Sequence, residues 1–293
     1  MREQSASMDQ DTLGTVRQQS AAELAKHYTW RKQLLELCSV LVFSALLSLM
    51  LARLVRQVDL RANAVLLGTA FLLSMAAADL VSGLVHWLAD TWGTVDVPIL
   101  GPTLVKNFRE HHSDPKALTR KGLVETNGDN CMILLPAQVG ALFMPLEGVG
   151  PEWIFAYGFV FSFVFWIMVT NQVHKWAHME LDELSWPVRA LQRIRIFLPK
   201  TEHDIHHTIP FESHYCITNG WMNAILAKSG FFRFLERATF RVTGAIPREN
   251  DIGTEAAVAL AIRQGVLPPD FEPDRSIVGT RSTPTAATVP PGP

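Results

Sequence analysis

Four long apolar runs constrain the fold of this 293-residue chain more than any other feature of its sequence. They lie at 34–54, 62–88, 131–147 and 153–173, and 48% of all residues are hydrophobic. At a rise of 1.5 Å per residue, a helix of about 20 residues crosses a hydrocarbon core of about 30 Å. The second run is longer than a bilayer requires, so we expect its helix to protrude. The sequence therefore predicts an all-α integral membrane protein with four transmembrane helices.

The rest of the sequence divides around these runs. Residues 1–29 are polar and are expected to form a disordered cytosolic lead, and 268–293, dense in Pro, Thr, Ser and Asp, a disordered tail. Between them, 30–246 is the predicted four-span domain with a His-rich helical cap, and 247–267 is a small soluble segment.

Two short helices are expected outside the spans. The segment 184–200 sets apolar residues against basic ones, which is typical of an amphipathic helix lying in the membrane interface, with packing on the cap as the alternative. A second helix is expected at 254–264.

The charged residues predict the orientation of the chain in the membrane and argue against nucleic acid as a partner. The net charge of −2 gives no general attraction for nucleic acid, and the three cysteines have no disulfide or zinc-ribbon spacing. Lys and Arg near span ends favour the cytoplasmic side. The lead, the 89–130 connection and the segment after 174 are basic, whereas the 148–152 turn has no basic residue and only the turn near 53–61 dissents. We therefore expect both termini and every histidine from His86 onward on the cytosolic face.

Ionisable residues recur at helical spacing near the end of the second run. Asp79, His86 and Asp90 share one face, which begins inside the membrane and runs out of it. An ionisable residue at membrane depth indicates a functional site by default. For Asp79 the alternative is a buried polar contact to a serine or a backbone group of another span.

Nine of the ten histidines follow the start of the second run, and four of them fall within 203–214. Neutral imidazole is the commonest side-chain metal ligand near neutral pH. A catalytic zinc uses three protein ligands and a structural zinc four, so nine histidines exceed the needs of one ion. Two five- or six-coordinate metals use about nine ligands. Imidazole suits iron, zinc and copper alike, and the count together with the membrane setting favours two irons. The set comprises His86, His111, His112, His174, His178, His203, His206, His207 and His214.

The sequence around these histidines resembles the plasmanylethanolamine desaturases, also called the Kua or CarF-like family. Plant plastid desaturases that place a trans double bond in phosphatidylglycerol share the pattern. The resemblance covers about residues 80–225. It rests on Ser82-Gly83-Leu84-Val85-His86-Trp87-Leu88-Ala89-Asp90, on Phe108-Arg109-Glu110-His111-His112, on Asn171-Gln172-Val173-His174-Lys175-Trp176-Ala177-His178, on His203-Asp204-Ile205-His206-His207 and on the stretch 214–221.

The resemblance implies a membrane di-iron desaturase that uses O2 as co-substrate. In the family's namesake reaction, the 1-O-alkyl chain of an ethanolamine phospholipid becomes the vinyl ether of a plasmalogen. An external cytochrome b5-like or ferredoxin-like carrier would supply electrons, and the membrane would be the bacterial inner membrane or the endoplasmic reticulum. Two alternatives stay open: an acyl-lipid desaturase or hydroxylase on the same scaffold, and a His-rich membrane metal transporter or sensor. The second predicts polar residues deep in several spans, and here only Asp79 lies deep.

The resemblance also implies roles for individual residues. All nine histidines are expected to bind iron, although adjacent histidines on a helix point about 100° apart, so His112 and His206 fit the set less well. Asp79 is placed at the substrate entrance. Four further residues are expected to accept the second N–H of a metal-bound imidazole. They are Asp90, Asn171, Asp204 and Asn219.

Overall fold

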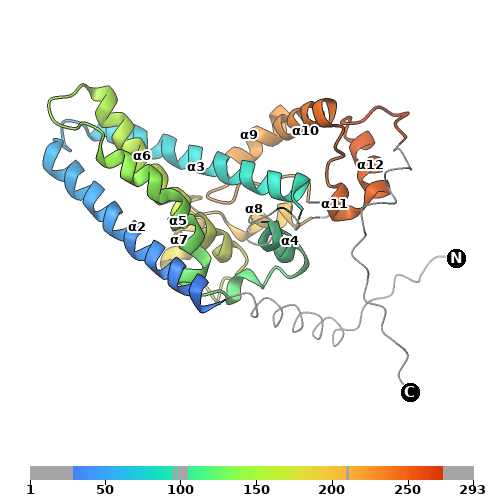
Figure 1. Ribbon diagram of the computed structural model, residues 1–293, viewed down its shortest axis with the longest axis horizontal. Coiled ribbons are helices and arrows are strands. Elements are labelled where there is room, and N and C mark those ends of the chain that lie inside the picture. Colours follow the sequence, from blue (N-terminus) through green and yellow to red (C-terminus); the bar gives the residue numbers. More distant parts are fainter. Residues whose placement is uncertain (1–28, 95–96, 98–104, 209–210, 273–293) are drawn as a thin grey trace, which may run out of the picture.

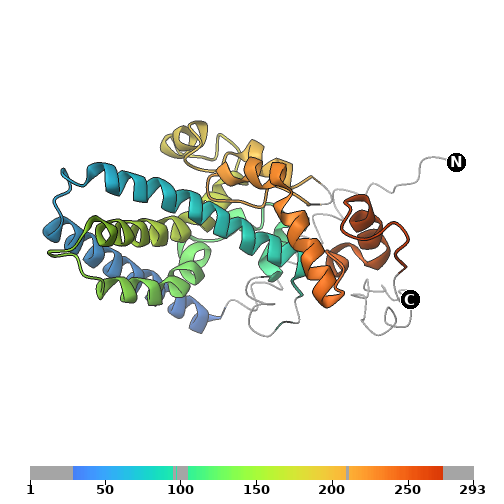
Figure 2. The ribbon, with the colours of Figure 1, turned by 90° about the horizontal axis from the view of Figure 1, so that it is seen from above.

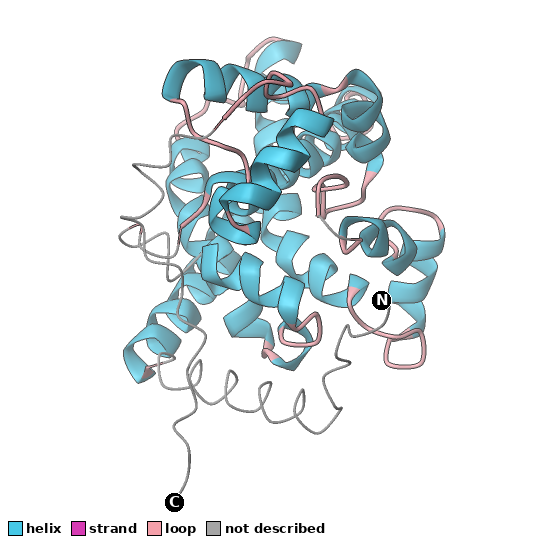
Figure 3. Cartoon of the chain, turned by 90° about the vertical axis from the view of Figure 1, so that its right-hand side faces the viewer, coloured by secondary structure: helices cyan, strands magenta, loops and turns pink. Residues whose placement is uncertain are grey.

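The computed structural model describes residues 29–94, 97, 105–208 and 211–272, and helices are the only regular elements within them (Figure 3). Residues 1–28 of the expected disordered lead and 273–293 of the expected tail lie outside this part. Four long helices run side by side as a bundle (Figures 1 and 2). They are α2 (Trp30–Gln57), α3 (Ala64–Trp92), α5 (Leu123–Leu142) and α6 (Pro151–Ala177).

Three of these helices, α2, α3 and α6, are long and apolar enough to cross a membrane. The prediction of an all-α fold is therefore confirmed for the described residues, and three of the four predicted spans correspond to helices suited to cross a membrane. Each helix is longer than the apolar run that predicted it. As expected, α3 continues past residue 88, and α6 continues to Ala177 with His178 as its C-cap.

The α5 helix differs from its prediction at both ends. The third apolar run was placed at 131–147, but the helix begins at Leu123 and ends at Leu142. Its first half is polar because those side chains bind α6: Asn127 Nδ2 lies 3.2 Å from Gln172 Oε1, and Asn130 Nδ2 donates to the Ile167 carbonyl at 2.8 Å. Because these contacts require polar side chains, hydropathy does not reveal the first two turns of α5.

Short elements cover the end of the bundle where α3 and α6 finish and α5 starts (Figure 1). The predicted amphipathic helix at 184–200 is shorter than expected. It ends at Arg193, and Arg195 has a φ of 56°, a left-handed conformation that no helix continues through. The covering elements are α4 (Lys106–Ser113), the 3-10 helix η2 (Leu118–Arg120), α7 (Trp186–Arg193), α8 (Lys200–His206) and α9 (Trp221–Ser229).

The segment after 246 is fastened to α3 by one buried arginine. Arg248 donates to the Tyr215 hydroxyl at 2.6 Å and to Glu236 Oε1 at 2.9 Å, and its backbone N–H donates to the Thr91 carbonyl at 2.8 Å. Glu236 belongs to α10 (Phe231–Thr243) and also accepts from Trp87 Nε1. The expected short helix is confirmed as α12 (Thr254–Arg263), preceded by α11 (Glu249–Ile252).

Asp79 holds the returning cap loop against α3. Its Oδ1 accepts the backbone N–H groups of residues 218, 219 and 220 at 2.9–3.1 Å, and its Oδ2 accepts that of Met222 at 3.0 Å. These donors include the unpaired N–H groups that begin α9. Asp79 thus makes a buried polar contact to backbone, as the alternative expected, but its partner is the cap loop and not another span.

Replacing Asp79 with Asn is expected to destabilise the fold. An amide oxygen can accept only part of these bonds, and its NH2 group would face backbone donors, so we expect a loss of about 2 kcal/mol or more in unfolding free energy. Thermal unfolding in detergent measures this. The exposed Asp182→Asn variant is the control and should change stability by less than about 0.5 kcal/mol. Equal stability of the two variants would contradict the anchoring role.

Candidate metal centre

Buried imidazoles gather at this end of the bundle in two groups that share one residue. In each group, one nitrogen atom per residue lies within 4.8 Å of the others. One group joins α3, α4 and α8, and the other joins α4, the end of α6 and α8. The first contains His86, His111, His112 and His206, and the second contains His111, His174, His178 and His203.

The second group brings Nε2 atoms into mutual contact. Nε2 of His203 lies 2.9 Å from those of His174 and His178, which are 3.2 Å from each other. His207 Nε2 joins them at 3.1 Å from His203 Nε2. A neutral imidazole nitrogen either donates or accepts, so three mutually close nitrogens cannot all be paired by hydrogen bonds. Lone pairs that converge in this way suit a cation.

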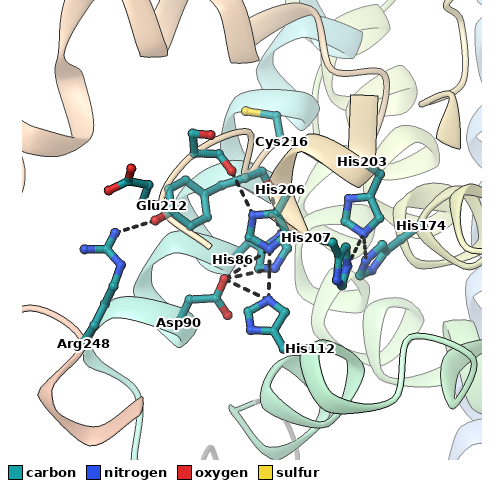
Figure 4. A network of polar contacts seen from close by, with 12 residues as sticks. His86, Asp90, His112, His174, His203, His206, His207, Glu212, Cys216 and Arg248 are labelled. Atoms are coloured by element: carbon teal, nitrogen blue, oxygen red, sulfur yellow. Dashed lines mark hydrogen bonds and ion pairs between the residues drawn. The ribbon is translucent and has the colours of Figure 1, made fainter. Parts of the chain in front are cut away.

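The first group converges on a carboxylate. Asp90 Oδ2 lies 3.2 Å from Nε2 of His86, 3.5 Å from Nε2 of His206 and 3.6 Å from Nε2 of His112 (Figure 4). Nε2 of His112 and Nε2 of His206 are 3.0 Å apart. We expected Asp90 to accept a hydrogen bond from the N–H of a metal-bound imidazole, on the side of the ring that faces away from the metal. It lies instead on the inner side, among the nitrogens that would bind the metal.

Backbone carbonyls occupy the outer positions. His86 Nδ1 contacts the Tyr215 carbonyl at 3.1 Å, and His206 Nδ1 contacts the Ser213 carbonyl at 2.9 Å. In the tautomer that donates Nδ1–H to these carbonyls, the Nε2 lone pairs point inward. The loop that Asp79 anchors therefore also orients the first group.

Burial keeps these imidazoles uncharged at neutral pH. Desolvation lowers the pKa of His206 to about 3 and that of His207 to about 4. It also holds the pKa of His111 and His203 well below the ordinary 6.5, and neighbouring histidines lower both further. A neutral imidazole retains the lone pair that a metal needs.

Two predicted ligands lie outside both groups: His207, whose Nε2 contacts that of His203, and His214. His214 is half-buried, has a φ of 57°, and directs Nδ1 to Ser213 Oγ at 3.0 Å. The chain reverses at this turn so that the Ser213 carbonyl faces His206, and His214 lines a separate cavity of about 290 Å³ with Glu212 and Arg233.

Three of the expected imidazole partners make other contacts. Asp204 is exposed and pairs with Lys200 Nζ at 2.9 Å, within the same turn of α8. Asn171 donates to the Thr126 carbonyl at 3.2 Å, across the contact between α5 and α6. Asn219 Oδ1 accepts the Trp221 N–H at 2.8 Å, at the start of α9. These three residues lie near histidines in the sequence, but their side chains serve contacts at helix ends and between helices.

A cavity of about 380 Å³ lies between α3, α5 and α6, and His111 and His174 are among the residues that line it. Its sides are apolar, formed by residues such as Val81, Val85, Met132, Ile133 and Ile167. Lys121, Glu125 and Asp129, just before and in the first turns of α5, form its polar end, which is the end nearest the histidines. Asp79 is not among the residues that line this cavity, because its carboxylate is turned to the 218–222 backbone, so the cavity gives no support to its expected place at an entrance.

Comparison with known proteins identifies the family. Residues 75–250 match the model of the lipid desaturase domain. The plasmanylethanolamine desaturase of Myxococcus xanthus is 46% identical over 250 residues, which cover 85% of this chain and 87% of the relative. Plasmanylethanolamine desaturase 1 of Mus musculus is 41% identical over 79% of this chain and 86% of its own length.

A plant relative shares a smaller region. The chloroplastic fatty acid desaturase 4 of Arabidopsis thaliana is 33% identical over 58% of this chain and 51% of its own length. No solved structure matches the chain. The matched domain contains every histidine of the two groups. The chain therefore belongs to the family of lipid desaturases that includes the plasmanylethanolamine desaturases, and it is an oxidoreductase.

Proposed function

We propose that this chain is an O2-dependent di-iron desaturase that converts the 1-O-alkyl chain of plasmanylethanolamine into the vinyl ether of a plasmalogen. The observation that carries the proposal is the pair of adjacent imidazole groups that share His111, beside a largely apolar cavity. The names of the relatives from Myxococcus xanthus and Mus musculus support the substrate class.

Eight histidines and one carboxylate would hold the metals. His86, His112, His206 and Asp90 form one site, His174, His178, His203 and His207 form the other, and His111 lies between them. Nitrogen and oxygen donors of this kind suit iron. When bound, the irons supply the O2-derived oxidising power that breaks unactivated C–H bonds, which acidic and basic side chains cannot do.

The reaction balances with a supply of electrons from outside the chain. Two hydrogens leave neighbouring carbons of the alkyl chain, and dioxygen is reduced to two waters with two further electrons and two protons. An external one-electron carrier, cytochrome b5-like or ferredoxin-like, would deliver the electrons at the cytosolic face.

The cavity favours attack near the start of the chain over attack in its middle. Its polar end lies at the depth of the histidines, and its apolar part runs away from them along α5. A lipid with its headgroup at the polar end presents its first chain carbons to His111 and His174. An acyl-lipid desaturase that acts in mid-chain would instead need the headgroup far from the histidines.

We further propose that α5 is a fourth span and that both termini and the histidines face the cytosol of a bacterial or of an endoplasmic reticulum membrane. The packing of α5 along α2 and α6 supports this arrangement. So does the absence of basic residues from 148–152.

The lipid product tests the activity. Cells that express the chain should gain acid-labile vinyl ethers in their ethanolamine phospholipids. His178→Ala should lower this product by more than about 100-fold because it removes a metal-binding nitrogen. His214→Asn is the matched control, since His214 lies outside both groups and Asn tolerates a positive φ. New acyl double bonds without vinyl ethers would contradict the proposed substrate.

Cysteine labelling in oriented vesicles tests the topology. In a Cys38→Ser background, Arg120→Cys and Asp182→Cys should react with an impermeant maleimide from the cytosolic side, because each lies in an exposed segment beside the histidines. Glu147→Cys should react only from the other side. Labelling of positions 120 and 147 from the same side would show that α5 does not cross the membrane.

Acidification should destabilise the metal-free protein. His206 and His207 have folded-state pKa values of about 3 and about 4, against 6.5 ordinarily. As pH falls below about 6.5, the unfolded chain binds protons that the folded chain does not, so the melting temperature should fall, whereas above that pH these groups contribute no slope. The double variant His206→Gln/His207→Gln should show a shallower decline between about pH 7.5 and 5. Equal slopes would contradict the buried neutral state.

A further inference from the structure

We infer that the cavity between α3, α5 and α6 binds one chain of a zwitterionic phospholipid, and that Glu125 and Lys121 bind its ammonium and phosphate groups. The inference rests on the proposed function for its substrate class. It adds the place where the chain lies and the residues that select the headgroup.

The apolar part of the cavity opens sideways toward the surface of the bundle. Helices α3 and α5 both pack on α6, which leaves the cavity between them. Val81 and Val85 of α3 are each 36% exposed, and Met132 and Ile133 of α5 are 37% and 69% exposed. Apolar side chains exposed along membrane helices face lipid, so a chain can enter from the bilayer without leaving an apolar environment.

The register of α5 against α6 sets the depth of the headgroup. Asn171 contacts the Thr126 carbonyl and Asn130 contacts the Ile167 carbonyl, so the two helices run antiparallel with Glu125 near the level of His174. From Glu125 to Ile133 the helix rises about 12 Å. A headgroup beside Glu125 therefore leaves the first chain carbons next to the metal-binding residues and the remainder along Ile133.

The polar end offers one charge of each sign. Lys121 Nζ donates to Asn107 Oδ1 at 3.1 Å, which leaves two of its three N–H donors for a phosphate. The Lys121 carbonyl accepts a hydrogen bond from Lys175 Nζ, which fixes this part of the backbone beside α6.

Glu125 is the carboxylate suited to an ammonium group. Nearby Asp129 already pairs with Lys32 Nζ at 3.4 Å. Glu125 makes neither a hydrogen bond nor an ion pair with any residue in the described part of the chain, and it interacts with Lys175 only at longer range. A half-buried carboxylate beside a lipid-sized cavity favours a cationic ligand, which a primary ammonium with three N–H donors provides.

Kinetics on two headgroups test the assignment. Iron-loaded enzyme is assayed with O2 and an external one-electron reductant in phosphatidylcholine vesicles that contain a 1-O-alkyl phospholipid with either an ethanolamine or a glycerol headgroup. Glu125→Gln should lower kcat/KM for the ethanolamine lipid about tenfold or more and change that for the glycerol lipid less than about twofold. Lys121→Gln should lower both alike, because both lipids carry a phosphate. Asp182→Asn is the control, and iron content should stay constant throughout. An unchanged preference in Glu125→Gln would overturn the assignment.

A binding measurement separates this inference from the proposed activity. An ethanolamine ether lipid with a photoreactive diazirine in its alkyl chain is cross-linked to the enzyme without oxygen, so that no turnover is needed. Peptides that contain residues 81–85 or 132–133 should be labelled. Val85→Trp should reduce labelling at least about fivefold by filling the cavity, whereas Leu72→Trp, at a 53% exposed position elsewhere on α3, should not.

The labelling experiment and the vinyl ether assay can fail independently, so their outcomes separate the cavity assignment from the proposed reaction. Labelling confined to other peptides would overturn the cavity assignment even if vinyl ethers form. Labelling at the expected peptides without any vinyl ether product would leave the cavity assignment standing and contradict the proposed reaction.

Discussion

The packing of α3 on α6 is the constraint on which the rest of the site depends. It sets His86 beside His174, with ring centroids 5.8 Å apart, on two helices whose backbone hydrogen bonds are satisfied internally. The cap helices α4 and α8 then bring their histidines to this pair of residues. Asp79 ties the returning loop to α3, and that loop carries the carbonyls of Ser213 and Tyr215 to the outer nitrogens of His206 and His86. One buried carboxylate thus links the stability of the cap to the orientation of the imidazoles.

The arrangement in two groups explains why histidines occur as neighbouring pairs in the sequence. The 100° divergence between neighbours on a helix counted against His112 and His206 as members of one ligand set. With two groups, the same divergence becomes useful. In α8 and its C-cap, His206 points to the first group while His207 points to the second, and in α4 His111 touches both while His112 joins the first. A pair of neighbours can therefore serve two metals from one short helix.

Much of this could be predicted from the sequence, and what could not has identifiable causes. Apolar runs located α2, α3 and α6, and the spacing of Asp79, His86 and Asp90 placed these residues correctly on one helix. The start of α5 was missed because its polar side chains bind α6 and leave no apolar run. The partners of the outer imidazole nitrogens are carbonyls, which carry no sequence signal. Arg248 also joins Tyr215 from a segment that composition alone marked as separate.

The iron content of purified protein tests the central claim of two adjacent metal sites most directly. Wild-type protein should hold about two irons per chain. His206→Ala and His178→Ala should each retain about one, because each removes a nitrogen from a different group while His111 remains. A single metal ion in the wild type, or stoichiometric zinc without iron, would contradict the account.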